Sequence, residues 1–304
     1  YLDNNSSTPT DENIVKTMHV FYSENYGNPH SHTHMKGINA NLEIEKSRQK
    51  IANYFNAPKE GVVFTSGATE SNNLAITGYI KKAKKDGINR KKVFCSAVEH
   101  KCVLECIQNA KVYDLEAHIL KVDSQGKLDL DYAQKCIDED TLLVSIMATN
   151  NETGIDLQIE EIGKMCNDNG VFFHSDIAQS LHHKLFDIEN SFIDIVSISG
   201  HKIYGPKGVG ALICKEEPIL NLEPLMLGGY QEAEIRSGTL PTNLCVGLGE
   251  AVDLLSKNKN TYYIHYKSLR DKLWNLLSKS IEDLQKNSLF IDHPGVLNLY
   301  FSMN

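Results

Sequence analysis

The chain alternates short apolar runs with helix-like segments, and this alternation restricts its fold more than any other feature. In "GVVFTSGATESNNLAI", an apolar run over Val62 to Phe64 is followed by a glycine turn and a helix that we expect to begin near Thr69. "KKVFCSAVEHKCVLECI" repeats this order, with a strand over 93–96 and a helix from about His100. Strands that alternate with helices predict an α/β domain with a mostly parallel sheet.

The pattern continues along the chain. "TLLVSIMATNNETG" predicts a buried strand ending in a polar turn, "VFFHSD" a strand ending on Asp176, and "FIDIVSIS" and "VGALICK" two more strands. "QIEEIGKMCNDNG" predicts an amphipathic helix closed by Gly170. Residues 257–285 are rich in charge and are expected to be helical, and the final "PGVLNLYFSMN" predicts a further strand.

The totals narrow the class of protein. With 304 residues, 41% of them hydrophobic and 23% charged, the chain is typical of one large or two ordinary globular domains. The net charge of −8 argues against direct nucleic-acid binding. No apolar run approaches the ~20 residues that span a membrane. The seven cysteines contain no C-x-x-C pair and predict neither a disulfide framework nor a zinc site, which fits a reducing compartment.

Polar residues follow five of the expected strands. In open α/β sheets, ligands bind at the carboxyl ends of the strands. The residues at these ends are Ser66-Gly67-Ala68-Thr69, Glu99-His100, Asn150-Asn151-Glu152, Asp176 and Ser199-Gly200-His201-Lys202. We therefore expect them to converge on one cleft.

Asp176 and Lys202 follow successive strands and indicate a chemistry. A lysine forms a Schiff base with an aldehyde only when its amine is unprotonated, which requires a desolvated site or cationic neighbours. Pyridoxal phosphate also needs a carboxylate that keeps its ring nitrogen protonated. An aspartate and a lysine on successive strand ends fit this cofactor, although an isolated Asp or Lys at a strand end is more often a cap or a solvated group.

Four other segments have two interpretations each. "SGATESNN" suits phosphate binding at a helix N-terminus, or an ordinary helix capped by Ser66 or Thr69. His100 suits a ring stacked on a flat cofactor or an acid–base group, or a helix cap. His30, His32 and His34 alternate as metal ligands do, but no carboxylate or cysteine joins them locally, and no metal is expected. "RSGT" at 236–239 is either a mobile loop or one that reaches a phosphate.

Taken together, the motifs resemble a known family. "YLDNNSSTP", "YGNPHS", "VVFTSGATESNNLAI", "EH", "NNETG", "HSDIAQS", "SGHKIYGPKGVGAL" and "RSGTLPTN" occur in the order seen in cysteine desulfurases. These are pyridoxal-phosphate (PLP) enzymes of the class V aminotransferase group, which mobilise sulfur for iron–sulfur clusters and tRNA thiolation. Among them, the chain resembles the housekeeping iron–sulfur type.

The resemblance implies a fold and a domain organisation. It implies the PLP-dependent transferase fold type I, a mostly parallel sheet with helices on both faces. Residues 13–250 would form the large PLP-binding domain. Residues 1–12 and 251–304 would form part of a smaller C-terminal domain, left incomplete. The expected location is the cytoplasm, or mitochondria if a leader preceded Tyr1.

The resemblance also assigns roles around the cofactor ring. Lys202 would hold the cofactor through a Schiff base and then move the Cα proton of the substrate. Asp176 would pair with the pyridinium nitrogen, and Gln179 would bond the ring phenolate. His100 would stack on the ring and assist proton transfer, and Asn151 would lie near the ring and the substrate.

The remaining roles concern the phosphate. The implied phosphate ligands are Ala68, Thr69, Ser199 and His201. Thr239 would reach the phosphate of a neighbouring subunit, so that the active site would belong to a homodimer. The adjacent His201 and Lys202 would thus place an anchor for the phosphate next to the residue that carries the aldehyde.

The implied reaction takes sulfur from L-cysteine to an enzyme persulfide and releases L-alanine, with a sulfur-acceptor or iron–sulfur scaffold protein as partner. In the family, the attacking cysteine and the arginine that binds the substrate carboxylate come after the position matching Asn304. None of the seven cysteines matches the attacking one, so we expect the working chain to be longer. "GGYQEAEI" also departs from the family pattern.

Two alternatives remain open. One is a class V enzyme that acts on another amino acid, as an aminotransferase or a lyase. The other is a catalytically idle scaffold for iron–sulfur assembly partners, although intact Lys202, Asp176 and His100 do not suit an idle protein. Alanine and sulfide formed together from cysteine would identify the desulfurase.

Overall fold

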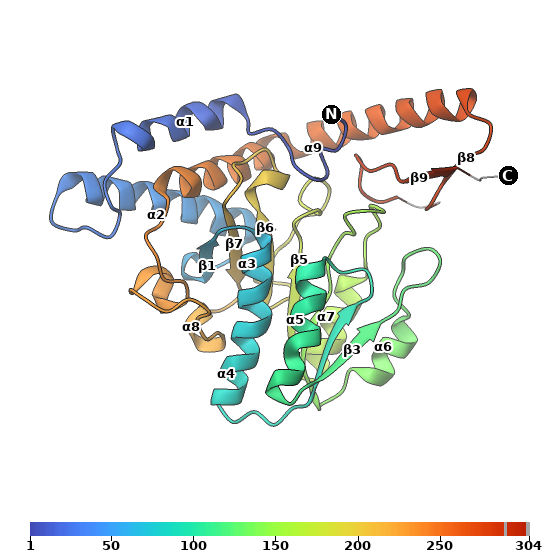
Figure 1. The fold of residues 1–304 in the computed structure, drawn as a ribbon, viewed down its shortest axis with the longest axis horizontal. Coiled ribbons are helices and arrows are strands. Elements are labelled where there is room, and N and C mark those ends of the chain that lie inside the picture. The colour runs from blue at the N-terminus through green and yellow to red at the C-terminus, as the bar shows by residue number, and fades with distance from the viewer. Residues whose placement is uncertain (289–290, 302–304) are drawn as a thin grey trace.

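A computed structural model describes residues 1–288 and 291–301 (Figure 1). Its centre is a seven-stranded sheet in the order β1-β7-β6-β5-β4-β2-β3. The strands are β1 Val62–Thr65, β2 Lys92–Ser96, β3 Glu116–Leu120, β4 Thr141–Ser145, β5 Phe172–Asp176, β6 Ile195–Ser199 and β7 Gly210–Cys214. Strand β7 runs antiparallel to β1 and β6, and the other neighbours are parallel. The predicted mostly parallel sheet is confirmed.

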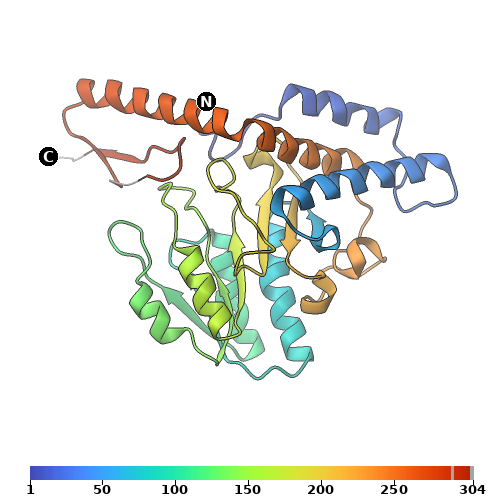
Figure 2. The same ribbon diagram turned by 180° about the vertical axis from the view of Figure 1, so that it is seen from behind.

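Helices cover both faces of this sheet. The helices of the described residues are α1 Glu12–Ser23, α2 Met35–Phe55, α3 Ala68–Asn73, α4 Tyr79–Lys85, α5 Lys101–Asn109, α6 Leu130–Cys136, α7 Ile159–Asp168, α8 Pro218–Asn221 and α9 Thr242–Ser280. A π-helical turn at Leu74–Gly78 joins α3 to α4. Helices α3, α4 and α5 lie over the face seen in Figure 1, and α2 and α7 lie over the opposite face seen in Figure 2.

Local sequence explains most of these elements. All five residues of β4 are buried, as expected for a central parallel strand with helices on both faces. Helix α7 buries Ile159, Ile162 and Cys166 along one side, and Gly170 follows it with a φ of 59°. The predicted amphipathic helix and its glycine stop are therefore confirmed. Among the described residues, no helix combines the length and apolar character needed to cross a membrane.

Helix α9 is longer than the sequence pattern indicated. It runs without a break through position 250, where we placed the end of the large domain, and its last buried residue is Leu255. The prediction of a helix over 257–285 is wrong at its end, because the helix stops at Ser280 and Leu284–Lys286 forms strand β8. The division into domains at 250 remains a prediction.

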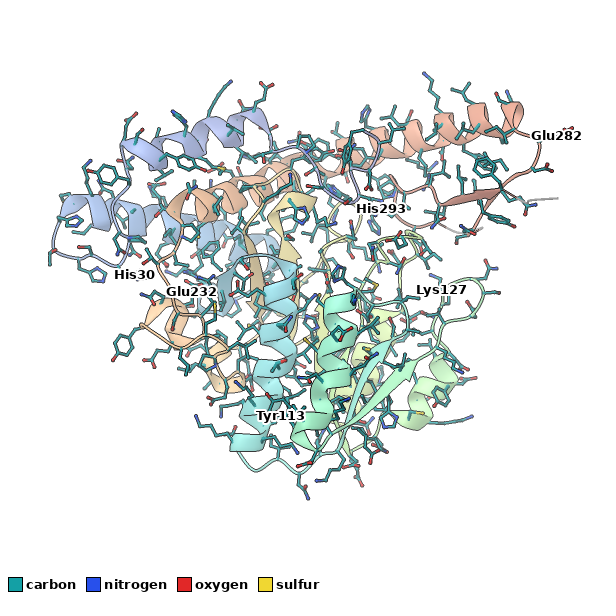
Figure 3. All side chains as sticks on the ribbon, viewed as in Figure 1. His30, Tyr113, Lys127, Glu232, Glu282 and His293 are labelled. Carbon is teal, nitrogen blue, oxygen red and sulfur yellow. The ribbon has the colours of Figure 1, made fainter. Side chains whose placement is uncertain are left out.

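Strand β8 pairs antiparallel with β9, Leu299–Phe301. The strand predicted from "PGVLNLYFSMN" is thus present over three residues, and positions 302–304 of that motif lie outside the described residues. The segment before β9 contacts the main body near His293, which Figure 3 labels. The backbone N–H groups of Asp292 and His293 donate to the carbonyl of Gly154 at 3.1 and 2.9 Å.

Candidate active site

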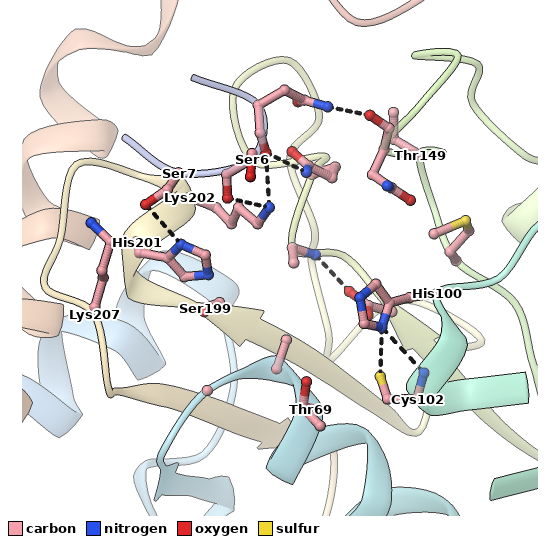
Figure 4. Close-up of a pocket in the computed structure, with 18 of the residues that line it drawn as sticks. Ser6, Ser7, Thr69, His100, Cys102, Thr149, Ser199, His201, Lys202 and Lys207 are labelled. Atoms are coloured by element: carbon pink, nitrogen blue, oxygen red, sulfur yellow. Dashed lines mark hydrogen bonds between the residues drawn. The ribbon is translucent and has the colours of Figure 1, made fainter. Parts of the chain in front are cut away.

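A cavity of about 750 Å³ lies at the sheet edge where β1, β2, β4, β5 and β6 end (Figure 4). It brings together nearly all the residues singled out in the sequence. Those that line it are Ala68, Thr69, His100, Asn151, Asp176, Gln179, Ser199, His201 and Lys202. The carboxyl ends of parallel strands meet at one edge of a sheet, so the predicted convergence is observed.

Lys202 ends the 3₁₀ turn Gly200–Lys202 that follows β6. Its Nζ donates to the carbonyls of Asn5 at 2.8 Å and Ser6 at 2.9 Å. Burial lowers the pKa of the Lys202 amine, and the nearby Asp176 charge opposes this effect without cancelling it. The amine is therefore more readily neutral than that of an exposed lysine.

Asp176 ends β5 and is 7% exposed, which makes it a buried carboxyl beside the cavity. Its Oδ2 accepts from Asn72 Nδ2 at 2.7 Å and its Oδ1 from the Ala178 N–H at 3.0 Å. Burial raises the pKa of Asp176, while these two hydrogen bonds and the charges of His100 and Lys202 act to lower it. A carboxylate has about four acceptor positions, so this one retains capacity for a donor in the cavity.

His100 caps a helix and also lines the cavity. It is the N-cap of α5, because its Nδ1 accepts the backbone N–H of Cys102 at 3.2 Å. The Cys102 Sγ lies 2.9 Å from the same nitrogen. The ring also lines the cavity. Since Nδ1 accepts an N–H, the neutral ring carries its proton on Nε2.

The start of α3 forms another wall. The helix begins at Ala68, with Gly67 as its N-cap at a φ of 148° and no capping side chain. The predicted cap by Ser66 or Thr69 is wrong, because Glu70 Oε2 instead accepts the Ser66 N–H at 2.6 Å. Strand β7 passes so close that a Cβ at Gly210 would lie 2.7 Å from the Gly67 Cα. This tight approach holds the turn at the cavity edge.

His201 and its neighbours make one end of the cavity rich in donors. His201 Nδ1 lies 3.2 Å from Ser7 Oγ, and its carbonyl accepts the Thr8 N–H at 2.9 Å. Burial, with the charges of Lys202 and Lys207, lowers the pKa of His201. Lys207 also lines the cavity. This set of donors suits an anionic group.

Sequence reasoning assigned no role to the N-terminal segment, yet Asn5, Ser6 and Ser7 line the cavity. The backbone carbonyl of Asn5 accepts from Gln179 Nε2 at 2.9 Å, and the side-chain amide of Asn5 donates to the Asn151 carbonyl. The only signal in the sequence was the match of "YLDNNSSTP" to the family. The segment thus ties two candidate site residues together.

Thr239 does not line this cavity and is exposed. The loop that carries it is nevertheless anchored, since Arg236 Nε donates to Glu70 Oε1 at 2.8 Å. Glu70 is the residue that also holds the turn before α3. Arg236 is therefore paired with a carboxylate and is not a solvated side chain.

Cys102 is the one thiol of the described chain that lines the cavity. Burial raises the pKa of Cys106 to about 11 and also raises the pKa values of Cys95, Cys166, Cys214 and Cys245. Burial likewise raises the pKa of Cys102. These thiols are held in their protonated, weakly nucleophilic form.

The histidine-rich stretch has a structural explanation. His34 is the N-cap of α2, where its Nδ1 accepts the Gly37 N–H at 3.0 Å. Across 1–288 and 291–301, no three His, Cys, Asp or Glu side chains are placed to hold a metal ion.

Comparison with known proteins places the chain in a family. The model of the family "Aminotransferase class-V" matches residues 1–298. The chain is 42% identical over 303 residues to the probable mitochondrial cysteine desulfurase of Dictyostelium discoideum, which covers 99% of this chain and 67% of that protein. The chain belongs to the cysteine desulfurase group of the class V aminotransferases. The mitochondrial cysteine desulfurase of Saccharomyces cerevisiae is also 42% identical, over 99% of this chain and 60% of its own length.

Solved structures of this group share the fold. A NifS-like protein superposes with a TM-score of 0.92 at 34% identity, over 99% of this chain and 81% of that one. A structure described as SspA in complex with cysteine gives a TM-score of 0.88 at 32% identity, over 99% and 83%. Fold type I, as the resemblance implied, is confirmed. Class V aminotransferases are PLP-dependent, so the expected cofactor agrees with the family.

Proposed function

We propose that this protein is a PLP-dependent cysteine desulfurase, which takes sulfur from L-cysteine to an enzyme persulfide and releases L-alanine. One observation carries the proposal. The partly buried Lys202 amine and the buried Asp176 carboxylate follow adjacent strands and line one cavity. The relatives named above are cysteine desulfurases, and one similar structure is described as a complex with cysteine.

The cavity fits pyridoxal phosphate in size and chemistry. Its volume of about 750 Å³ lies within the range of small-molecule sites. Asp176 has acceptor capacity left for a protonated ring nitrogen, and burial favours a neutral Lys202 that can bond an aldehyde. Gln179 would contact the ring oxygen, and His100 and Asn151 would flank the ring.

The donor-rich end fits the phosphate. In our proposal, Ala68 and Thr69 at the start of α3, with Ser199 and His201, hold this group. Thr239, exposed on its anchored loop, would come from a neighbouring subunit. Helix starts and histidine or serine donors are common partners of phosphate oxygens.

The chemistry divides between cofactor and chain. Pyridoxal phosphate, when bound, supplies an electrophilic carbon and a ring that withdraws electrons from the substrate Cα. Lys202 Nζ, with its pKa lowered by burial, takes the Cα proton and returns it later. Asp176 keeps a proton on the ring nitrogen, and His100 holds a proton on the Nε2 atom that is free of the α5 cap.

Sulfur transfer requires an enzyme thiolate. The thiolate attacks the substrate sulfur, so that an S–S bond forms while the substrate C–S bond breaks, and proton uptake at Cβ completes L-alanine. We propose an iron–sulfur scaffold or another sulfur acceptor as the partner that receives this sulfur. Because two relatives are mitochondrial proteins, we propose a mitochondrial location.

A spectrum and a product analysis test the proposal. Protein purified with pyridoxal phosphate should absorb visible light, and Lys202→Ala should lose this band. With L-cysteine and a thiol reductant, the full-length protein should form alanine and sulfide in equal amounts. Folded protein without the band would refute the cofactor site. A keto acid from another amino acid, without alanine and sulfide, would favour the class V alternative. A bound cofactor with no turnover in the full-length protein would favour the scaffold.

A further inference from the structure

The turn that carries Lys202 is held through its backbone by other parts of the chain. The last carbonyls of a short 3₁₀ turn have no partner within it. Here the Lys202 carbonyl accepts from His182 Nε2 at 2.8 Å. On either side of it, the His201 carbonyl accepts the Thr8 N–H at 2.9 Å, and the Tyr204 carbonyl accepts the Asp11 N–H at 3.0 Å. The direction of the Lys202 side chain therefore depends on groups outside the turn.

His182 is built to make this bond. Its side chain belongs to the segment after β5 and is 6% exposed, and its Nδ1 has no partner among the described residues. The ring packs edge-on against the rings of Tyr204, Tyr266 and His293, with centroids 6.1, 5.5 and 6.1 Å away. Burial lowers the pKa of His182 to about 4, so the ring is neutral at pH 7 and carries its proton on Nε2.

The residue after the turn adds a reason why such support is needed. Tyr204 has a φ of 62°, a left-handed conformation that aromatic residues rarely adopt. Its hydroxyl accepts a hydrogen bond from the Tyr266 hydroxyl at 2.8 Å. The aromatic group around His182 thus stabilises a strained backbone two residues from Lys202.

We propose that His182 is a positioning residue for Lys202, which sets the direction of the lysine side chain by donating Nε2–H to the lysine's own carbonyl. Without this donor the partly buried carbonyl loses its partner, and its peptide plane rotates toward another donor. A small rotation at the backbone is amplified along the four-carbon side chain, so Nζ leaves its productive position. The inference rests on the proposed function, because it assumes that Lys202 bonds the cofactor aldehyde.

Two ligands separate the position of Lys202 from the shape of the site. Pyridoxal phosphate reacts with Lys202, whereas pyridoxamine phosphate has the same ring and phosphate but no aldehyde. The rate at which apoprotein captures pyridoxal phosphate covalently is measured by borohydride trapping and mass spectrometry. The affinity for pyridoxamine phosphate, which binds without a covalent bond, is measured by fluorescence.

The variants isolate the hydrogen bond. His182→Phe keeps a ring but removes the donor, and His182→Gln places an amide nitrogen near the position of Nε2. His183→Phe is the matched control, because His183 is a neighbouring buried ring that bonds Asp156 at 2.9 Å and not Lys202. We expect His182→Phe to slow capture about ten-fold while pyridoxamine phosphate affinity stays within about two-fold. We expect His182→Gln and His183→Phe to capture the cofactor nearly as the wild type does.

The outcomes are distinguishable. The inference is overturned if His182→Phe captures pyridoxal phosphate as fast as the wild type does. It is also overturned if the variant loses capture rate and pyridoxamine phosphate affinity to the same extent. Either result leaves the proposed function intact. Failure of the wild type to capture pyridoxal phosphate overturns the proposed function itself. If His182→Phe does not fold, His182→Asn replaces it, since the shorter amide does not reach the Lys202 carbonyl. Equal capture rates for the Asn and Gln variants would then overturn the inference.

Discussion

The amide of Asn72 on α3 donates to the Asp176 carboxylate on β5 at 2.7 Å, and both side chains are buried. This bond links the helix that starts at the donor-rich end of the cavity to the strand that carries its acid. Burial raises the pKa of Asp176, and the Asn72 bond works against that rise by stabilising the ionised form. Asn72 was not among the candidate site residues in the sequence.

Asn72→Leu should therefore weaken cofactor binding through Asp176. Loss of the donor raises the Asp176 pKa further, so less of the carboxylate is ionised at neutral pH. We expect pyridoxal phosphate affinity to fall about ten-fold relative to wild type at pH 7, and by less at pH 8.5. Absorbance titration at both pH values measures it. Asn73→Leu is the control, because among the described residues the Asn73 side chain bonds the Thr69 carbonyl on the exposed side of α3 and not Asp176. A loss that does not change with pH would contradict this account.

Thr239 should act across a subunit boundary. It is exposed, yet its loop is anchored by the Arg236–Glu70 pair, so it is presented outward in a defined position. We expect a symmetric homodimer, the commonest assembly, in which Thr239 bonds the neighbour's phosphate. Thr239→Val should leave the sedimentation coefficient unchanged and lower pyridoxal phosphate affinity about ten-fold, as expected for loss of a bond to a charged group. A cofactor-loaded monomer in sedimentation would exclude this arrangement.

Glu99 should make the protein less stable as pH rises. It is 6% exposed, its Oε1 accepts from Ser96 Oγ and the Met147 N–H at 2.7 Å each, and burial raises its pKa from 4.5 to about 8. In the folded state Glu99 then keeps a proton that it releases above pH 4.5 in the unfolded state. Stability from this group is full below pH 4.5 and falls by up to about 1.4 kcal/mol per pH unit until about pH 8.

Glu99→Gln, which is neutral at every pH, should flatten this dependence. Urea unfolding at pH 6, 7 and 8 gives the slope of the unfolding free energy for both proteins. The exposed Glu105→Gln on α5 is the control for loss of a carboxylate. Parallel slopes for wild type and Glu99→Gln would show that Glu99 is ionised in the folded protein.

Buried histidines should destabilise the protein in acid. Burial lowers the pKa values of His174 and His293 to about 3 and that of His182 to about 4. The unfolded chain takes up these protons near the usual pKa of 6.5, whereas the folded chain does not. The stability that these groups contribute is therefore present above pH 6.5 and is lost as pH falls toward 4.

In the variant His174→Gln, position 174 no longer takes up a proton when the chain unfolds in acid. His174 lies between Ser145 Oγ at 2.8 Å and Ser197 Oγ at 2.9 Å, and a glutamine side chain retains polar groups for both hydroxyls. Between pH 6 and 4.5 we expect the slope of unfolding free energy to decrease by up to about 1.4 kcal/mol per pH unit. Guanidinium unfolding across this range measures it, with the exposed His19→Gln as control. An unchanged slope would mean that His174 is protonated in the folded state.

Local patterns in the sequence determined the sheet and the chemistry of its edge. The positions of Asp176 and Lys202 could be predicted because each directly follows an apolar run that forms a buried strand. Parallel strands present their carboxyl ends along one edge, so residues far apart in sequence meet without any further information. The same reasoning placed His100 and Thr69 in the cavity.

Contacts between distant, non-periodic segments were decided by the tertiary structure alone. Asn5 and Ser6 reach Lys202, Arg236 reaches Glu70, and His182 bonds the Lys202 carbonyl. None of these pairs shares a helix, a strand or a turn, so no local period predicts it. Strand β8 likewise forms from charged sequence because β9 pairs with it. A local pattern records the face that a segment buries, but the partner it meets depends on how the whole chain packs.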